Sequence, residues 1–303
     1  MDNKSAIIFN IVHGSFVDGY GIRTTVFLKG CPLRCLWCCN PEGQAAHPEI
    51  KFIPANCNRC DNCLEVCPVN AISKAADSTI KIDRALCTNC GKCIDVCYTG
   101  ALDFFGKRMT LDEVLTIVKK DEPFYRESGG GVTIGGGEPT LQSAFTLELI
   151  RECKKNYIHT AVDTCGYTTT DEGFQVLVEV DLLLFDLKGI NIAEHKNNTG
   201  VSNEIILENL KKLNDMGKPI IIRMPIIPDL TDSAENIEST GQFLSALQSV
   251  ERVDLIAYHE YGRIKHEQLG REYCLNKGRI TEEELDDIRY TLENHGLSVQ
   301  IGG

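Results

Sequence analysis

Short apolar runs alternate with amphipathic stretches from about residue 105 to the end of the chain. Residues 182–185 and 219–222 are continuous apolar runs of strand length, residues 132–134 predict a further short strand, and apolar positions between them recur at helical spacing. Further strands are predicted at residues 161–162 and 253–257, and helices at residues 111–118, 141–154, 172–180, 205–213 and 233–247 and from residue 281. Continuous apolar strands between amphipathic helices are typical of a parallel sheet covered on both faces. The pattern predicts an α/β fold of about six strand–helix units.

Three cysteines directly follow the first strand that we expect in this sheet. Apolar runs at residues 7–9 and 26–28 flank a glycine-rich turn, which predicts a β-hairpin whose second strand ends at Gly30. Cys31, Cys35 and Cys38 come next. Their spacing lets three thiolates converge on one small group, and thiolates suit iron–sulfur clusters or zinc. A cluster held by three thiolates leaves one iron open for chemistry, and loops after strands carry the active residues of α/β barrels.

Residues 52–104 contain an internal duplication of cysteines. Every cysteine of a first set of four recurs thirty positions later, with similar flanking residues. This is the pattern of a bacterial ferredoxin with two clusters, in which the fourth cysteine of each set serves the other cluster. A zinc site is the alternative to iron–sulfur clusters for these cysteines. One cluster would take Cys57, Cys60, Cys63 and Cys97, and the other would take Cys87, Cys90, Cys93 and Cys67.

Composition narrows the class of protein and the compartment. The 303 residues are 43% hydrophobic and 24% charged, which allows a globular core. The net charge of −12 argues against nucleic acid or an anionic membrane as a partner. No secretory signal or membrane span is expected, so the fifteen cysteines indicate metal ligands in a reducing cytoplasm. Cys153 and Cys274 are expected to be packing residues.

The loop at residues 31–38 resembles the cluster motif of the radical S-adenosylmethionine (radical SAM) enzymes. Residues 18–24 and 30–42 narrow the resemblance to the activating enzymes of glycyl radical enzymes. This resemblance implies a [4Fe–4S] cluster held by Cys31, Cys35 and Cys38, with SAM chelating the fourth iron. One-electron reduction would cleave SAM, and the resulting radical would take a hydrogen atom from a glycine of a partner enzyme. Tyr20 replaces the proline that is common at this position in the family.

The residues at two strand ends match cofactor-binding motifs of the family. Glycines at residues 135–137 let backbone approach a ligand closely, and the resemblance implies that Gly136, Gly137 and Glu138 hold the methionine amine of SAM. An ordinary strand–helix turn is the alternative. Asp163, followed by a threonine, would bind a monovalent cation beside the cofactor's carboxylate, or would simply cap a turn.

Later strand ends supply the remaining candidates. By resemblance, Asp186 and Lys188 bind SAM and shape the place of the target glycine, and Arg223 contacts the cofactor site or the target backbone. We expect these three residues to act at the reaction centre. His259, after the strand at 253–257, matches the histidine that contacts the cofactor. Further cofactor contacts are expected from Trp37, Cys38 and Cys39, the last on the adenine side.

The expected architecture is a partial (β/α)6 radical SAM barrel with an inserted two-cluster ferredoxin-like domain. Residues 1–51 would form the first part of the barrel with the cluster loop, residues 52–104 the insert, and residues 105–303 the remainder. The resemblance implies three [4Fe–4S] clusters and an electron donor such as flavodoxin or ferredoxin. The insert could relay electrons, dock the partner or serve as structure. The sequence also allows two alternatives: a radical SAM enzyme acting on a small molecule, and a ferredoxin-type electron carrier.

Overall fold

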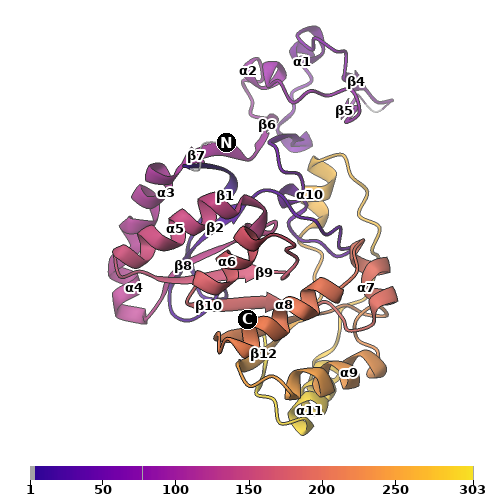
Figure 1. Cartoon of the computed structure of the whole chain (residues 1–303). Helices are drawn as coiled ribbons and strands as arrows, with labels where there is room; N and C mark the ends of the chain where they lie inside the picture. Colours follow the sequence, from indigo (N-terminus) through magenta and orange to yellow (C-terminus); the bar gives the residue numbers. More distant parts are fainter. Residues whose placement is uncertain (1–3, 77, 303) are drawn as a thin grey trace.

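One mixed sheet forms the body of the protein (Figure 1). A computed structural model describes residues 4–76 and 78–302. Within this part the large sheet has the order β13-β12-β11-β10-β9-β8-β2-β1-β7, parallel from β2 through β13, with antiparallel β1 and β7 at one edge. Its strands are β1 (Ser5–Ser15), β2 (Arg23–Leu28), β7 (Lys107–Thr110), β8 (Gly131–Gly136), β9 (His159–Thr164), β10 (Leu182–Asp186), β11 (Ile220–Ile226), β12 (Val250–Ala257) and β13 (Val299–Ile301).

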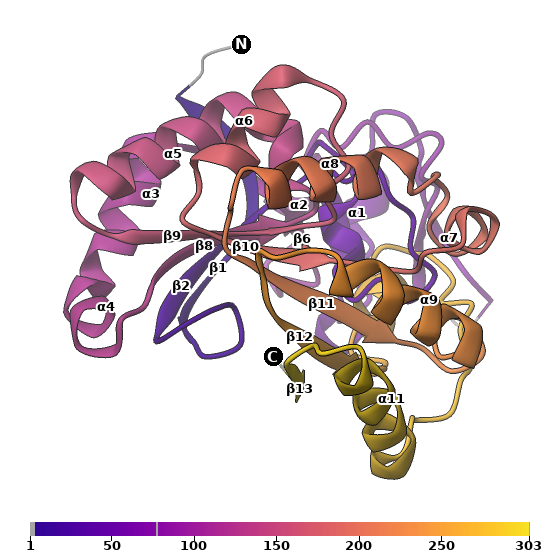
Figure 2. The ribbon, with the colours of Figure 1, turned by 60° about the horizontal axis from the view of Figure 1, so that its bottom comes forward.

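Helices connect successive parallel strands and cover the outside of the curved sheet (Figure 2). The long ones lie where the amphipathic pattern predicts them, so the partial (β/α)6 barrel is confirmed. The short helices α4, α7 and α10 were not predicted, because they give little periodic signal and lack the capping box that marks the equally short α3. The helices are α3 (Leu111–Val118), α4 (Glu122–Ser128), α5 (Ser143–Lys155), α6 (Asp171–Glu179), α7 (Ile192–Thr199), α8 (Glu204–Asp215), α9 (Ala234–Ser245), α10 (Arg263–Gln268) and α11 (Glu282–Asn294), with 3-10 turns η1 (Pro41–Gly43), η2 (Pro54–Asn56), η3 (Lys119–Asp121) and η4 (Pro139–Gln142).

The alternation of side chains along each strand divides the core into two layers. On β10, Leu183 and Phe185 join the large cluster beneath the helices. Leu182 and Leu184 point the other way and pack with Ile221 in a smaller cluster. Both faces of the strand are therefore buried, which explains its unbroken apolar sequence. Side chains fill the interior of the barrel at this level, and the open space lies toward the carboxyl ends of the strands.

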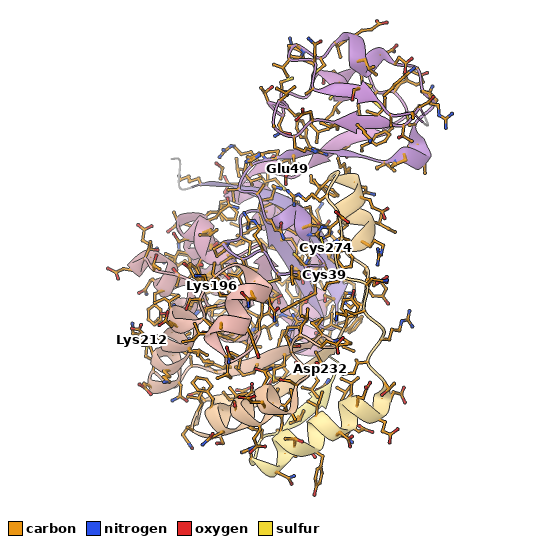
Figure 3. The ribbon with its side chains drawn as sticks, turned by 90° about the vertical axis from the view of Figure 1, so that its right-hand side faces the viewer. Cys39, Glu49, Lys196, Lys212, Asp232 and Cys274 are labelled. Atoms are coloured by element: carbon orange, nitrogen blue, oxygen red, sulfur yellow. The ribbon has the colours of Figure 1, made fainter. Side chains whose placement is uncertain are left out.

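The insert folds around a core of its own. Its two-stranded sheets are β3 (Glu49–Phe52) with β6 (Leu102–Phe105) and β4 (Ile72–Lys74) with β5 (Ile80–Ile82); its helices are α1 (Asn62–Glu65) and α2 (Lys92–Asp95). Their buried apolar residues form a cluster separate from that of the barrel. The insert projects from one end of the barrel, with Glu49 at the junction (Figure 3). Arg271 binds Glu49 Oε1 at 2.5 Å, and Arg84 of the insert donates to the carbonyl of Gln268.

Two sequence-based expectations have different outcomes here. No helix in the described part of the chain is long and apolar enough to cross a bilayer. Cys153 is fully buried in the barrel core, as expected for a packing residue. Cys274 is exposed, so that part of the prediction is wrong: it lies in an irregular segment after α10, which packs no sulfur against the core.

Candidate cofactor and cluster site

The loop that carries Cys31, Cys35 and Cys38 is held by backbone hydrogen bonds from several directions. The amides of Arg34 and Leu36 donate to the carbonyls of Thr199 and Asn198, at 2.7 and 3.0 Å. These carbonyls are available because they lie at the end of α7, where no further helical turn uses them. The Cys31 amide donates to Gln44, in the chain that leaves the loop. A loop without regular structure is therefore fixed by its surroundings.

The second support of the loop is α10. The ring Nε2 of His266 lies 3.1 Å from the carbonyl oxygen of Cys38. Gly262, just before α10, leaves no room for a Cβ, because that atom would lie 2.6 Å from the same carbonyl oxygen. Lys265 reaches back to Asn40 Oδ1 at 2.7 Å and to Glu42 Oε1 at 2.7 Å. The loop is thus clamped between α7 and α10, both of which the sequence patterns missed.

The thiols of this loop fit a positively charged group such as an iron cluster. Burial raises the pKa of Cys35 to about 12, and it also raises the pKa of Cys38, with the neighbouring thiols adding to both shifts. The pKa of Cys31 is lowered, chiefly by its hydrogen bond with Cys165. Thiolates crowded together in a buried site repel one another, so binding to iron is what makes their ionised forms favourable. Sulfur donors of this kind suit iron–sulfur clusters.

A cavity of about 440 Å³ opens next to the cluster loop. It is lined by residues at or just beyond the carboxyl ends of β2, β8, β9, β10, β11 and β12. The carboxyl ends of parallel strands are where α/β barrels place their active residues. Of the residues singled out in the sequence, the cavity brings together Cys31, Cys35, Trp37, Cys38, Cys39, Gly136, Gly137, Asp163, Asp186, Lys188, Arg223 and His259.

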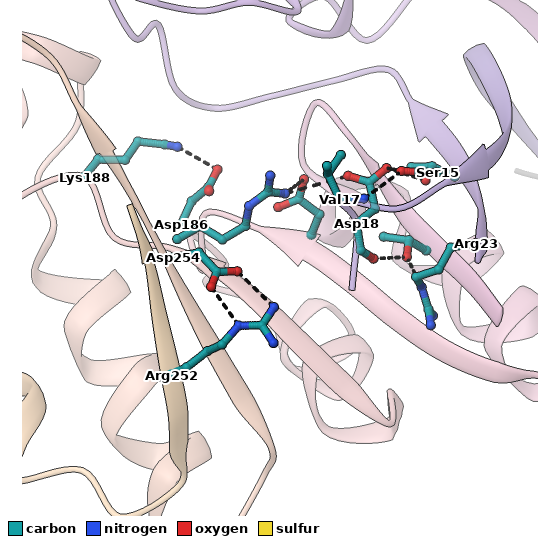
Figure 4. Close-up of polar contacts among 12 residues, drawn as sticks. Ser15, Val17, Asp18, Arg23, Asp186, Lys188, Arg252 and Asp254 are labelled. Carbon is teal, nitrogen blue, oxygen red and sulfur yellow. Dashed lines mark hydrogen bonds and ion pairs between the residues drawn. The ribbon is translucent and has the colours of Figure 1, made fainter. Parts of the chain in front are cut away.

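Charged pairs line one wall of the cavity (Figure 4). Lys188 Nζ donates to Asp186 Oδ2 at 2.7 Å. Burial opposes the charge of Lys188, but the attraction of Asp186 outweighs it and the pKa of the lysine is raised. Arg223 lies 3.2 Å from Asp163 Oδ2 and 3.8 Å from Asp18 Oδ1. The cavity therefore offers both fixed cations and carboxylate oxygens, as binding of a zwitterionic cofactor requires.

Asp163 and His259 each keep an atom for a ligand. Burial raises the pKa of Asp163 to about 7 against the opposing attraction of Arg223. Its Oδ1 atom is buried and has no hydrogen-bond partner within the described residues, and the same holds for His259 Nδ1. The His259 ring stacks on Tyr261 with centroids 4.3 Å apart, and burial lowers the pKa of the histidine, which favours its neutral form. Unpaired buried polar atoms are costly, so both are suited to contact a bound group.

The eight cysteines of the insert surround two small voids. Cys57, Cys60, Cys63 and Cys97 line one of them, and Cys67, Cys87, Cys90 and Cys93 line the other. The fourth cysteine of each sequence run therefore joins the first three of the other run. No three His, Cys, Asp or Glu side chains within residues 4–76 and 78–302 are placed to hold a single metal ion. The sulfur atoms around a four-iron cluster stand farther apart than those around one ion.

Backbone amides point at the sulfur atoms that close these two sets. Ala71 donates to Cys67 Sγ at 3.2 Å, and Leu102 donates to Cys97 Sγ at 3.3 Å. Burial works against ionisation at both cysteines, but the backbone hydrogen bonds prevail and the pKa of each thiol is lowered. Such bonds stabilise thiolate ligands and tune the potential of iron–sulfur clusters. The two voids therefore fit iron–sulfur clusters.

Comparisons with known proteins agree with this geometry. The family model of the radical SAM superfamily matches residues 91–244, and that of the 4Fe-4S dicluster domain matches residues 56–101. The chain is 44% identical over 291 residues to an isethionate sulfite-lyase activating enzyme of Nitratidesulfovibrio vulgaris, covering 94% of each chain. It is 37% identical over 307 residues to a choline trimethylamine-lyase activating enzyme of Oleidesulfovibrio alaskensis, covering 99% of each.

The chain belongs to the glycyl radical enzyme activating enzymes of the radical SAM superfamily. It is thus a radical SAM enzyme that uses SAM and a [4Fe–4S] cluster to activate a glycyl radical enzyme. A crystal structure of Streptococcus suis SuiB bound to S-adenosylmethionine matches with a TM-score of 0.51 at 17% identity, covering 64% of this chain and 43% of that one. That similarity shows the fold alone.

The side chain of Glu138 ties two strands together in this activating enzyme, and the expected part of Glu138 in holding the methionine amine stays a prediction. Its side chain is fully buried behind the cavity wall, which Gly136 and Gly137 line instead. Its carboxylate accepts hydrogen bonds from the Thr164 hydroxyl at 2.9 Å and from the Cys165 amide at 2.8 Å. The side chain of Glu138 therefore ties the end of β8 to the end of β9, and thereby fixes the wall that faces the ligand.

Several residues of the site were not found from the sequence. Asp18 belongs to the family motif at residues 18–24, but only the structure places it in the cavity beside Arg223. Thr199 acts through its carbonyl and His266 through a contact with a carbonyl, and neither interaction leaves a periodic signal. Such supports depend on segments that are more than a hundred residues apart.

Proposed function

We propose that SAM binds in the cavity between the cluster loop and the charged wall, and that three [4Fe–4S] clusters are present. The single observation that carries this proposal is the convergence of Cys31, Cys35 and Cys38 on a cavity that Lys188 and Asp186 also line. When bound and reduced, the cluster and SAM together supply a carbon radical that can take a hydrogen atom from a glycine Cα.

The residues of this chain then bind, orient and shield. Lys188 and Asp186 form a fixed pair beside the cluster loop, and we assign them to SAM and to the position of the target glycine. Gly136 and Gly137 leave room for the methionine amine at the backbone. The free Nδ1 of His259 and the neighbouring Trp37 and Cys39 suit the adenosine end.

We assign a monovalent cation to Asp163. The buried Oδ1 of this residue has no protein partner within the described residues, and carboxylate oxygen is a good ligand for hard cations. Arg223 already compensates the other oxygen at 3.2 Å. We assign Arg223 to the charge balance of this wall, where it also faces Asp18.

We infer that the insert carries the other two clusters and relays electrons from a donor such as flavodoxin or ferredoxin in the cytoplasm. Its separate core and its two cysteine-lined voids support a unit that assembles around its own clusters. This unit would extend over residues 52–104, between two parts of the barrel at 1–51 and 105–303. The net charge of −12 supports the expectation that nucleic acid is not a partner.

A pure electron carrier would have no use for the cavity beside the cluster loop. Membership in a family with a radical SAM barrel therefore argues against that alternative. The other alternative is that the protein is a radical enzyme acting on a small molecule. It is tested by supplying the reduced protein with SAM and with a glycyl radical enzyme or a peptide from its glycine segment. We expect a glycyl radical signal in electron paramagnetic resonance and one 5′-deoxyadenosine per radical. SAM cleavage with no radical on any such partner would contradict this proposal.

The assigned residues are tested by Lys188→Ala and His259→Ala. Each should weaken SAM binding about tenfold or more, the loss expected for a charged or buried polar contact. The iron content should stay at the wild-type level, because neither residue is a cluster ligand. Lys196→Ala is the matched control, since Lys196 is exposed on α7 outside the cavity (Figure 3). Wild-type affinity in both test variants would show that the site is assigned wrongly.

A further inference from the structure

The large sheet does not close into a complete barrel. In the described part of the chain its edges are β7 and β13, which do not pair with each other. The open side therefore lies between β1 and β7 on one hand and β12 and β13 on the other (Figure 2). Val12 of β1 and Ile256 of β12 both line the cavity, so the cavity is bounded by the two sides of this opening.

Tyr20 spans the open side near the amino end of β12. It lies in the loop of residues 16–22 between β1 and β2, and its hydroxyl donates to Glu251 Oε2 at 2.5 Å. The guanidinium of Arg252 lies 5.2 Å from the centre of the Tyr20 ring. Arg252 is itself fixed by Asp254, whose side chain is buried (Figure 4). A phenol, a carboxylate and a stacked cation thus link segments about 230 residues apart.

The tyrosine remains a hydrogen-bond donor over the range of physiological pH. Burial and the hydrogen bond to Glu251 raise the pKa of Tyr20, with Arg252 opposing. The Tyr20 side chain is 41% exposed, yet it contacts Glu251 and Arg252, whereas the apolar side chains of Phe16 and Val17, at 73% and 54% exposed, offer no polar group to β12. The link between this loop and β12 therefore depends on Tyr20.

The same loop reaches the cavity through Asp18. Asp18 Oδ2 accepts hydrogen bonds from Ser15 and Thr25, each at 2.6 Å, and its backbone carbonyl accepts one from Thr133 at 2.6 Å. Its other carboxylate oxygen faces Arg223. Only Gly19 separates Asp18 from Tyr20, and its φ of +116° belongs to a backbone shape that favours glycine. Asp18 is thus held beside Arg223 by hydrogen bonds of its own, and Tyr20 holds the next part of the same loop to β12.

We propose that Tyr20 is a positioning residue that holds the loop of residues 16–22 across the open side of the barrel. By this link it fixes the rim past which a segment of the partner enzyme reaches the cavity. The inference rests on the proposed function, because it concerns access of a protein substrate. A preformed rim lowers the entropy cost of binding that segment. Loss of the link should therefore raise the KM for the partner while leaving the handling of SAM unchanged.

The test compares Tyr20→Phe, Tyr20→Ala and Glu251→Gln in the cluster-loaded enzyme. Tyr20→Phe keeps the ring on Arg252 and removes the hydrogen bond, so we expect about a three- to tenfold rise in the partner concentration at half-maximal radical formation. Tyr20→Ala should give a larger rise. Glu251→Gln retains an acceptor, so it should lie between wild type and Tyr20→Phe. Tyr290→Phe, at an exposed tyrosine on α11, is the matched control.

Two further readouts separate positioning from general damage. SAM binding and partner-free SAM cleavage should stay within about twofold of wild type, and amide hydrogen exchange of residues 16–22 should become faster in both Tyr20 variants. An unchanged KM for the partner in Tyr20→Ala would overturn the proposal, as would a parallel loss of partner-free cleavage. If the wild type forms no glycyl radical on any partner, the proposed function fails. The link is tested separately, because unchanged hydrogen exchange of residues 16–22 in the Tyr20 variants would overturn it.

Discussion

A buried ion pair at the junction of barrel and insert gives the sharpest stability prediction. The side chain of Lys29, two residues before Cys31, is completely buried. Its ammonium group donates to the carbonyl of Glu42 and to Glu49 Oε2, the latter at 3.2 Å. Burial lowers the pKa of Lys29, and Glu49 opposes that shift. The change to test is Lys29→Met, which keeps the length of the side chain and removes its charge.

The expected cost follows from what remains after the change. Breaking a buried pair costs about 3–5 kcal/mol when one charge is left uncompensated. Here Arg271 still binds Glu49 at 2.5 Å, which places the electrostatic loss at or below the low end of that range. The carbonyl of Glu42 also loses a donor, at about 1–3 kcal/mol. We expect local opening of the junction to become easier by about 3 kcal/mol, or about two orders of magnitude in the opening equilibrium.

Native-state amide hydrogen exchange of the cluster-loaded protein measures this opening directly. The amides to follow are Gly30, which donates to Gly43 at 2.7 Å, and Cys31, which donates to Gln44 at 3.0 Å. Their protection should fall about a hundredfold in Lys29→Met. Lys212→Met removes an exposed partner of Glu208 on α8, and it should change protection by about twofold at most. If Lys29→Met changes protection by no more than this control, the pair does not hold the junction.

Three other expectations concern the clusters, the insert and pH. The reconstituted enzyme should hold about twelve iron atoms, and joint replacement of Cys31, Cys35 and Cys38 by alanine should leave about eight and abolish SAM cleavage; an iron count near four in the wild type would contradict the two-cluster insert. Replacing residues 50–105 by a short Gly/Ser linker should preserve SAM cleavage with a strong artificial reductant, because the insert has its own core, and loss of cleavage in a folded, cluster-loaded variant would refute this division of labour. Since burial raises the pKa of Asp163 to about 7, the folded protein binds a proton that the unfolded chain has released above about pH 4, so stability should fall as pH rises toward 7. The loss of unfolding free energy between about pH 5 and about pH 7, measured by urea unfolding, should be smaller in Asp163→Asn than in the wild type. An equal loss in both proteins would count against the raised pKa of Asp163.

The sequence by itself determined the elements that depend on local pattern. Thr110 and Glu113 form the capping box that their spacing predicts, because this motif joins residues within one helical turn. The apolar runs became parallel strands, since a strand buried on both faces needs an unbroken apolar sequence. The repeated spacing of the insert cysteines also indicated two sets of four, because equal spacing in the two halves predicts two loops of the same shape.

Tertiary structure alone decided which distant groups meet. Lys29 reads as one more charged residue after a strand, and nothing near it in the sequence reveals that it is buried against Glu49. Thr199 and His266 support the cluster loop through contacts with backbone carbonyls, which carry no residue-specific signal. Glu138 was recognised from its motif, yet its carboxylate faces β9 and not the cavity. Such contacts depend on how helices and strands pack, and packing brings together residues whose separation in the sequence is too long for any local pattern to record.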